Sequence, residues 1–244
     1  MLFRSEAGRL DRLCARHELT SAHLSDLAGA VADFHVTAAI APVESRFGSP
    51  VEVQVPALDN FNDLLRLLPI PSVQDRLQHL LAWTEAQFED LAPLMELRKR
   101  GGRVRECHGD LHLANLVLIE NRVRMFDCIE FNQDLRWIDV ASEIAFTFVD
   151  LLDHGQPGLA NWFVDEVFSR NGDYDAALVL RFYAVYRAMV RAKVAAIRDG
   201  QTQTDSTEAL AYLALAEKLT APPPPKLVIT HGLAGCGKSV ASSL

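Results

Sequence analysis

The chain has 244 residues, of which 49% are hydrophobic and 23% are charged, and its formal net charge is -8. This composition is that of a globular protein, and the length suffices for one large or two small domains. The acidic balance argues against non-specific binding to nucleic acid, which depends on a surplus of Lys and Arg.

The cysteines and the apolar runs predict a cytoplasmic protein. The four cysteines form neither a CxxC pair nor a dense framework, which is typical of a reducing compartment. The N-terminus has no apolar signal core, and no uncharged run approaches the roughly 18 residues that a membrane span needs. We therefore expect no contact with a membrane.

The N-terminal region is predicted to be mainly helical. Residues 1–4 could end a strand, and residues 10–13 could form a short helix. Thr20 or Ser21 then caps a longer helix, because apolar residues recur after it at intervals of three and four. These residues are Leu24, Leu27, Ala28, Val31 and Phe34. His35 is expected to be a polar brace at the end of this helix.

The next segment is rich in helix-breaking residues. Residues 41–56 carry Pro, Ser and Gly without periodicity, which predicts a loop. A short helix is expected over residues 60–68, and Pro69 and Pro71 end it.

A longer amphipathic helix follows these prolines. Ser72 is predicted to cap it, with Asp75 completing a capping box. Pro93 should bend or interrupt it, and the basic residues 98–100 are expected to form a solvated helix end.

The centre of the chain predicts a polar loop followed by a β-hairpin. Its parts are a lead-in at 104–107, a strand at 116–119, a turn at 120–122 and a second strand at 123–126. A hairpin of this length returns Asp127 to the start of its first strand, where Asn115 lies. Asp110, Asn115 and Asp127 can therefore converge on one pocket.

These three residue types suit phosphoryl transfer. An Asp can orient an attacking hydroxyl and take its proton, while an Asn and a second Asp supply hard oxygen ligands to Mg²⁺ that bridges nucleotide phosphates. Asp110 and Asn115 lie at opposite ends of one loop, so that one can face the acceptor and the other the metal.

The central motifs resemble the aminoglycoside phosphotransferase and choline kinase-like families, relatives of the protein kinases. The motifs are His108-Gly109-Asp110 with Asn115, Phe126-Asp127, and Trp137-Ile138-Asp139-Val140-Ala141. The resemblance implies that Asp110 is the catalytic base, that Asn115 and Asp127 bind Mg²⁺, and that ATP donates the phosphate. It further implies that Asp139 braces the catalytic loop through hydrogen bonds.

Two other interpretations of the loop remain. His108, Asp110 and His112 could form a zinc cluster, because imidazole and carboxylate groups are ordinary zinc ligands. That interpretation leaves Asn115 and Asp127 unexplained, and no His-rich segment follows nearby. The loop could also be an incidental polar loop. The two His residues are then expected to brace it.

The C-terminal half is again predicted to be helical. The expected helices run from near residue 139 to 154, over 157–169, over 174–198, and from a capping box at 205–208 to about 219. The charged residues of the third helix are expected to mark a solvated face. The predicted fold class is α+β, mostly α, with a small hairpin at the catalytic site. It matches the large C-terminal lobe of a protein-kinase-like fold.

A change of composition follows this lobe. Residues 222–225 are four prolines, which predict a stiff spacer. An apolar strand at 226–230 then leads into a phosphate-binding loop of the pattern GxxxxGK[ST]. Its nucleotide-binding residues are Gly232, Gly235, Gly237, Lys238 and Ser239. A chance Gly-rich turn is the alternative.

The predicted organisation is a kinase-like large lobe at 1–220, a linker at 221–225 and the start of a P-loop α/β domain at 226–244. The first lysine is Lys99. We therefore expect that the nucleotide-gripping small lobe is missing and that the chain is a fragment.

Three functions agree with these patterns. The first is ATP-dependent transfer of the γ-phosphate to a hydroxyl of a small molecule. The second is a non-catalytic, kinase-like regulatory domain that controls the P-loop domain. The third places the activity in the P-loop domain itself. None of the motifs names the acceptor or the oligomeric state.

Overall fold

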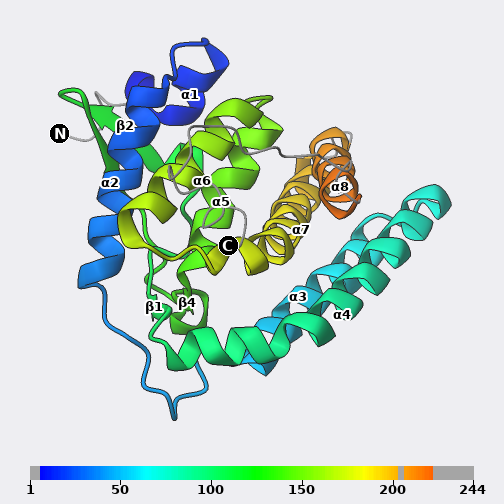
Figure 1. The fold of residues 1–244 in the computed structure, drawn as a ribbon. Helices are drawn as coiled ribbons and strands as arrows, with labels where there is room; N and C mark the ends of the chain where they lie inside the picture. Colours follow the sequence, from blue (N-terminus) through cyan, green and yellow to red (C-terminus); the bar gives the residue numbers. More distant parts are fainter. Residues whose placement is uncertain (1–5, 203–205, 222–244) are drawn as a thin grey trace, which may run out of the picture.

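The computed structural model describes residues 6–202 and 206–221 (Figure 1). The helices are α1 (Leu10–Ala15), α2 (Ser21–Thr37), α3 (Pro50–Leu67), α4 (Pro71–Arg100), α5 (Val140–Asp153), α6 (Pro157–Asn171), α7 (Ala176–Thr202) and α8 (Thr207–Thr220). The strands are β1 (Val104–Glu106), β2 (Leu116–Ile119), β3 (Arg122–Met125) and β4 (Trp137–Asp139). This confirms a mostly helical α+β protein with a small hairpin. The expected strand end at 1–4 and the whole P-loop segment lie outside the described residues.

Helix α5 lies at the centre of the molecule, between α6 and α7 (Figure 1). Its side chains are buried on nearly every side, including Ile144, Ala145 and Val149. Two hydrophobic clusters meet along it. One contains residues of α1, α2 and α6, and the other contains residues of α3, α4 and α8. The central helix therefore links both halves of the core.

The N-terminal helices agree with the sequence pattern. Thr20 caps α2 in a capping box with His23, whose ring accepts from the Thr20 amide at 3.3 Å. Leu24, Leu27 and Val31 are fully buried in the cluster that α2 shares with α6. The intervals of three and four residues thus predicted the buried face correctly.

The expected loop at 41–56 is wrong in its second part, because α3 begins at Pro50. Ser49 caps this helix by accepting from the Glu52 amide at 3.4 Å. Pro50 occupies the first helical position, where a missing N–H costs nothing. Pro56 lies farther inside the helix. Phe61 on the same helix is buried, so tertiary packing stabilises a helix where the Pro, Ser and Gly content predicted a loop.

Helix α4 also departs from the prediction. It begins after Ile70 with Pro71 at its first position, and no side chain caps it, so the expected capping box of Ser72 and Asp75 does not form. The helix continues through Pro93 as a single element beside α3 (Figure 1). Residues on both sides of this proline are buried, so packing offsets the lost backbone hydrogen bond.

The basic end of α4 is buried at Arg98 and Lys99, contrary to the prediction, and exposed at Arg100. Arg98 is 4% exposed and donates to both oxygens of Asp139, at 2.7 and 2.8 Å. It also donates to both oxygens of Asp173, each at 2.9 Å. Lys99 donates to the carbonyl of Ser45. Arg98 thus joins the end of α4 to the start of α5 and to the turn before α7.

Two strand pairs flank the predicted catalytic segment. Strands β1 and β4 pair antiparallel, and β2 pairs with β3 in the register Leu116↔Met125. The hairpin turn consists of Glu120 and Asn121, with φ angles of 50° and 58°. Positive φ at both positions is the type I′ geometry that suits a two-residue hairpin. The predicted hairpin is therefore confirmed.

The described helices include none that combines the length and the apolar character needed to cross a membrane.

Replacement of Arg98 tests the buried ion pairs. We expect Arg98→Met to lower the free energy of unfolding by about 3–5 kcal/mol, because two buried carboxylates lose their cation. Chemical denaturation measures this loss. Arg100→Met on the same helix is the control. Its side chain is 64% exposed and pairs with Glu96, so we expect a change within about 0.5 kcal/mol. Equal effects of the two substitutions would contradict a structural role of the Arg98 pairs.

Candidate active site

The predicted catalytic loop runs from Cys107 to Asn115, between β1 and β2. Gly109 has a φ of 87°, and a Cβ atom there would approach the carbonyl oxygen of Leu135 to 2.7 Å. Only glycine satisfies both conditions. The loop therefore passes closely over residues 133–135 just before it reaches Asp110.

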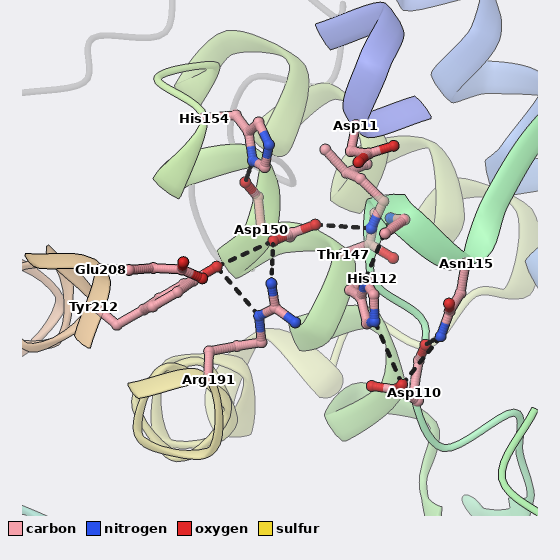
Figure 2. Close-up of polar contacts among 12 residues, drawn as sticks. Asp11, Asp110, His112, Asn115, Thr147, Asp150, His154, Arg191, Glu208 and Tyr212 are labelled. Atoms are coloured by element: carbon pink, nitrogen blue, oxygen red, sulfur yellow. Dashed lines mark hydrogen bonds and ion pairs between the residues drawn. The ribbon is translucent and has the colours of Figure 1, made fainter. Parts of the chain in front are cut away.

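One face of α5 holds the backbone of this loop. Glu143 accepts from the amides of His108 at 2.8 Å and Gly109 at 3.3 Å. Thr147 donates its hydroxyl to the carbonyl of Leu111 at 2.6 Å. Asp150 accepts from the amide of Leu113 at 2.7 Å. Figure 2 shows Thr147 and Asp150 against the loop.

The brace differs from the one that the sequence resemblance implied. Asp139 caps α5 by accepting from the Ala141 amide at 2.8 Å, and its other contacts go to Arg98. Glu143, Thr147 and Asp150 brace the loop instead. Sequence reasoning missed them, although polar residues spaced by four and three in an apolar helix are a recognisable signal.

Glu143 is fully buried behind the loop. His35 at the end of α2 approaches it, with 3.3 Å between Nε2 and Oε2. This agrees with the polar brace expected of His35. Burial raises the pKa of Glu143, but the hydrogen bond and charge of His35, with further contributions from Cys107 and His108, outweigh burial. The pKa therefore lies below the ordinary value, and the carboxylate stays ionised.

Glu143→Gln tests this buried carboxylate. Because its pKa is lowered on folding, Glu143 stabilises the fold above its ordinary value of 4.5, and this contribution is lost as pH falls through the lower folded value. We expect the variant to lose about 2–3 kcal/mol near neutral pH, since an amide N–H₂ faces backbone donors. The deficit should shrink in acid.

Denaturation over a pH series measures this effect. Glu85→Gln, at an exposed position of α4, is the control. A deficit that does not vary with pH would contradict the ionised state of Glu143.

Asp110 and Asn115 are in direct contact at the two ends of the loop (Figure 2). The Asn115 amide nitrogen donates to the Asp110 carboxylate at 3.0 Å and to the Asp110 carbonyl at 2.9 Å. His112 Nε2 lies 3.4 Å from the same carboxylate oxygen. The loop thus presents Asp110 with one amide and one imidazole as fixed partners.

Two arginines of α7 add positive charge near Asp110. Burial raises the pKa of Asp110, but the hydrogen bond and charge of His112 and the charges of Arg191 and Arg187 outweigh it. The pKa is therefore lowered. The expected solvated face of α7 is wrong at Arg187, which is 3% exposed. Arg191 donates to the Tyr212 hydroxyl at 3.1 Å and approaches Asp150 to 3.7 Å (Figure 2).

His112→Gln tests the electrostatic part of this arrangement. Loss of the imidazole removes the largest contribution that lowers the pKa of Asp110, so this pKa should rise relative to the unmodified protein. Carboxyl NMR titration, with Asp110→Asn for assignment, measures the shift. His79→Gln, at an exposed position of α4, should leave it unchanged. An unaltered pKa in His112→Gln would contradict the assigned contact.

The hairpin returns Asp127 to the start of β2. The Phe126 amide donates to the Asn115 carbonyl at 3.1 Å, so Asp127 directly follows a residue bonded to Asn115. His108 Nε2 contacts the Phe126 carbonyl at 2.8 Å and joins the loop to this point. Asp127 is exposed and has a φ of 60°. Such backbone conformations outside glycine are uncommon and occur frequently at functional sites.

Asn115 and Asp127 offer oxygen donors of the kind that a hard divalent cation takes. The Asn115 nitrogen faces Asp110, which leaves its amide oxygen as a possible ligand, and within the described residues no partner occupies the Asp127 carboxylate. Amide and carboxylate oxygens are the ligands that Mg²⁺ prefers. Asn115 and Asp127 are thus the residues that could hold the metal.

The zinc alternative fits the geometry less well. Both ring nitrogens of His108 have protein contacts, with the Phe126 carbonyl and the Asp110 amide. His112 likewise contacts the Ala114 amide and Asp110. Ring nitrogens engaged in this way are not available to a metal, which favours the bracing role.

The predicted nucleotide-binding residues of the P-loop lie outside the described residues. These are Gly232, Gly235, Gly237, Lys238 and Ser239. Their role stays a prediction.

Comparison with known proteins finds relatives in mycobacteria. The chain is 32% identical over 143 residues to the uncharacterized protein Rv2004c of Mycobacterium tuberculosis, and equally to the uncharacterized protein Mb2027c of Mycobacterium bovis. The alignment covers 58% of this chain and 29% of each relative, so the chain spans less than a third of their length. No protein-family model matches the chain.

Proposed function

We propose that residues 1–220 form the large lobe of a kinase-like phosphotransferase that transfers the γ-phosphate of ATP to a hydroxyl of a small molecule. The contact between Asp110 and Asn115, with the hairpin that returns Asp127 beside Asn115, carries this proposal. Residues 221–225 would be a linker and residues 226–244 the start of a P-loop domain. A cytoplasmic location is part of this proposal, because the four cysteines form neither a CxxC pair nor a dense framework.

In the proposed reaction Asp110 is the base. The acceptor hydroxyl oxygen bonds to the γ-phosphorus, the bond to the oxygen between the β- and γ-phosphorus breaks, and ADP leaves. The hydroxyl proton passes to the Asp110 carboxylate. The lowered pKa of Asp110 keeps it ionised, and its bond from Asn115 fixes its orientation.

Asn115 and Asp127 would hold Mg²⁺ through their side-chain oxygens. Bound with the nucleotide, Mg²⁺ neutralises charge on the phosphates. The left-handed backbone of Asp127 and the contact of His108 with the Phe126 carbonyl support this role. The Asp127 carboxylate would therefore hold the metal, and Asp110 would face the acceptor.

Two substitutions with different expected outcomes test this assignment. Asp110→Asn should lower the rate of phosphate transfer by about 10²–10⁴-fold, because the proton acceptor is lost. It should leave Mg²⁺-dependent nucleotide binding intact. Asp127→Asn should weaken that binding as well. Phosphate transfer to a panel of hydroxylated compounds and calorimetric titration with Mg²⁺-ATP measure these effects in the protein from its complete reading frame.

The control is Asp165→Asn on the exposed face of α6, which should affect neither measurement. Unchanged transfer in Asp110→Asn would overturn the assigned base. Nucleotide binding without transfer to any acceptor would instead favour a regulatory kinase-like domain.

A further inference from the structure

A cavity of about 290 Å³ opens beside the catalytic loop, between α3, β4 and α7. Its size is near the lower limit for small-molecule sites. Residues that line it include Phe47, Val53, Leu135, Trp137, Tyr186 and Arg187. The rings of Phe47 and Trp137 stack with centroids 5.4 Å apart. The walls are thus largely aromatic and apolar.

Arg187, which lines this cavity, has one donor without a partner among the residues that the structure describes. Arg187 is only 3% exposed, and its Nε donates to the Ser142 carbonyl at 3.1 Å. The guanidinium lies over the rings of Phe146 and Tyr186, at 4.6 and 5.3 Å from their centroids. Within the described residues its Nη2 is buried and has no hydrogen-bond partner. A buried donor of this kind is costly unless an acceptor satisfies it.

The acidic residues of the same lining already have partners. Arg46 donates hydrogen bonds to the carboxylates of Glu52 at 2.7 Å and Asp134 at 2.5 Å. Arg98 occupies both oxygens of Asp139. A cationic ligand would therefore have to displace an existing ion pair, whereas an anionic ligand would displace none and would bring an acceptor towards Arg187.

The cavity adjoins the proposed catalytic base. Leu135, which lines it, is the residue whose carbonyl oxygen a Cβ atom at Gly109 would contact. Gly109 immediately precedes Asp110. Arg187 is also close enough for its charge to lower the pKa of Asp110. A ligand in the cavity would thus be next to the loop that presents Asp110.

From these contacts we infer that the cavity binds a small molecule that carries an oxyanion, a carboxylate or a phosphate, and that Arg187 recognises this group. The inference rests on the proposed function in one respect. Under that function the ligand is the acceptor, and its hydroxyl faces Asp110. The aromatic walls accommodate the carbon skeleton, and the guanidinium supplies charge-assisted hydrogen bonds to the anion. Arg187 is therefore a specificity-determining residue.

The test measures binding in the absence of nucleotide, so that its outcome is separate from that of phosphate transfer. The probes are matched pairs that differ in charge, glycerate with glycerol and gluconate with glucose, together with the amine glucosamine. Calorimetry or saturation-transfer NMR on the full chain measures affinity. We expect the anion of each pair to bind at least about tenfold more tightly than its neutral partner, as expected for a hydrogen bond to a charged group.

Arg187→Gln should abolish this preference. Arg170→Gln, an exposed arginine of α6 that pairs with Glu166, should retain it. Because Arg187 is buried, a second variant leaves it in place: Val55→Trp, at a position 53% exposed that lines the cavity, should weaken anion binding about tenfold by filling the space.

Three results would overturn the inference. They are equal binding of the neutral compounds, tighter binding of glucosamine, and an anion preference that survives both Arg187→Gln and Val55→Trp. If anions bind as expected but Asp110→Asn leaves phosphate transfer unchanged, the proposed function fails and the anion site stands. If transfer depends on Asp110 but no anion preference is found, the proposed function stands and the anion site fails.

Discussion

The hydrogen bonds between α5 and the predicted catalytic loop are the interaction on which the candidate site depends. Glu143, Thr147 and Asp150 lie on one face of a helix whose other faces are buried in the core. A loop held only by its own turns would sample many conformations, and ordering it costs about 1–2 kcal/mol per residue. Hydrogen bonds that join Glu143, Thr147 and Asp150 to the loop backbone offset part of this cost. The position of Asp110 therefore follows from the packing of the central helix.

Buried charges in this protein serve to join segments that are distant in sequence. Arg98 links α4 to Asp139 and Asp173, and His35 links α2 to Glu143. Each such contact is stabilising only because the partners are complete, since an isolated buried charge is costly. His35, Arg136 and Arg187 each have one buried side-chain nitrogen without a hydrogen-bond partner within the described residues, and of these only Arg187 lines the cavity beside α3, β4 and α7. Its place in the cavity lining makes Arg187 a candidate ligand-binding group.

Local patterns predicted the elements well where a single segment contains the whole signal. The caps and apolar intervals of α2 and the two-residue turn of the hairpin are examples, because their stabilising contacts lie within a few residues. Prolines were misleading. Pro50 and Pro71 begin helices, because the first helical position has no backbone bond to lose. Pro93 lies inside a helix, because packing with distant helices compensates for the lost backbone bond.

The sequence by itself determined the helical class, the hairpin and the grouping of Asp110, Asn115 and Asp127, because these depend on short-range spacing. Only the tertiary structure decided that Glu143 rather than Asp139 braces the loop, and that Arg98 and Arg187 are buried rather than solvated. The physical reason is that the burial of a charged side chain depends on partners from other elements. Such partners are tens of residues away in sequence, and only the packed helices bring them together.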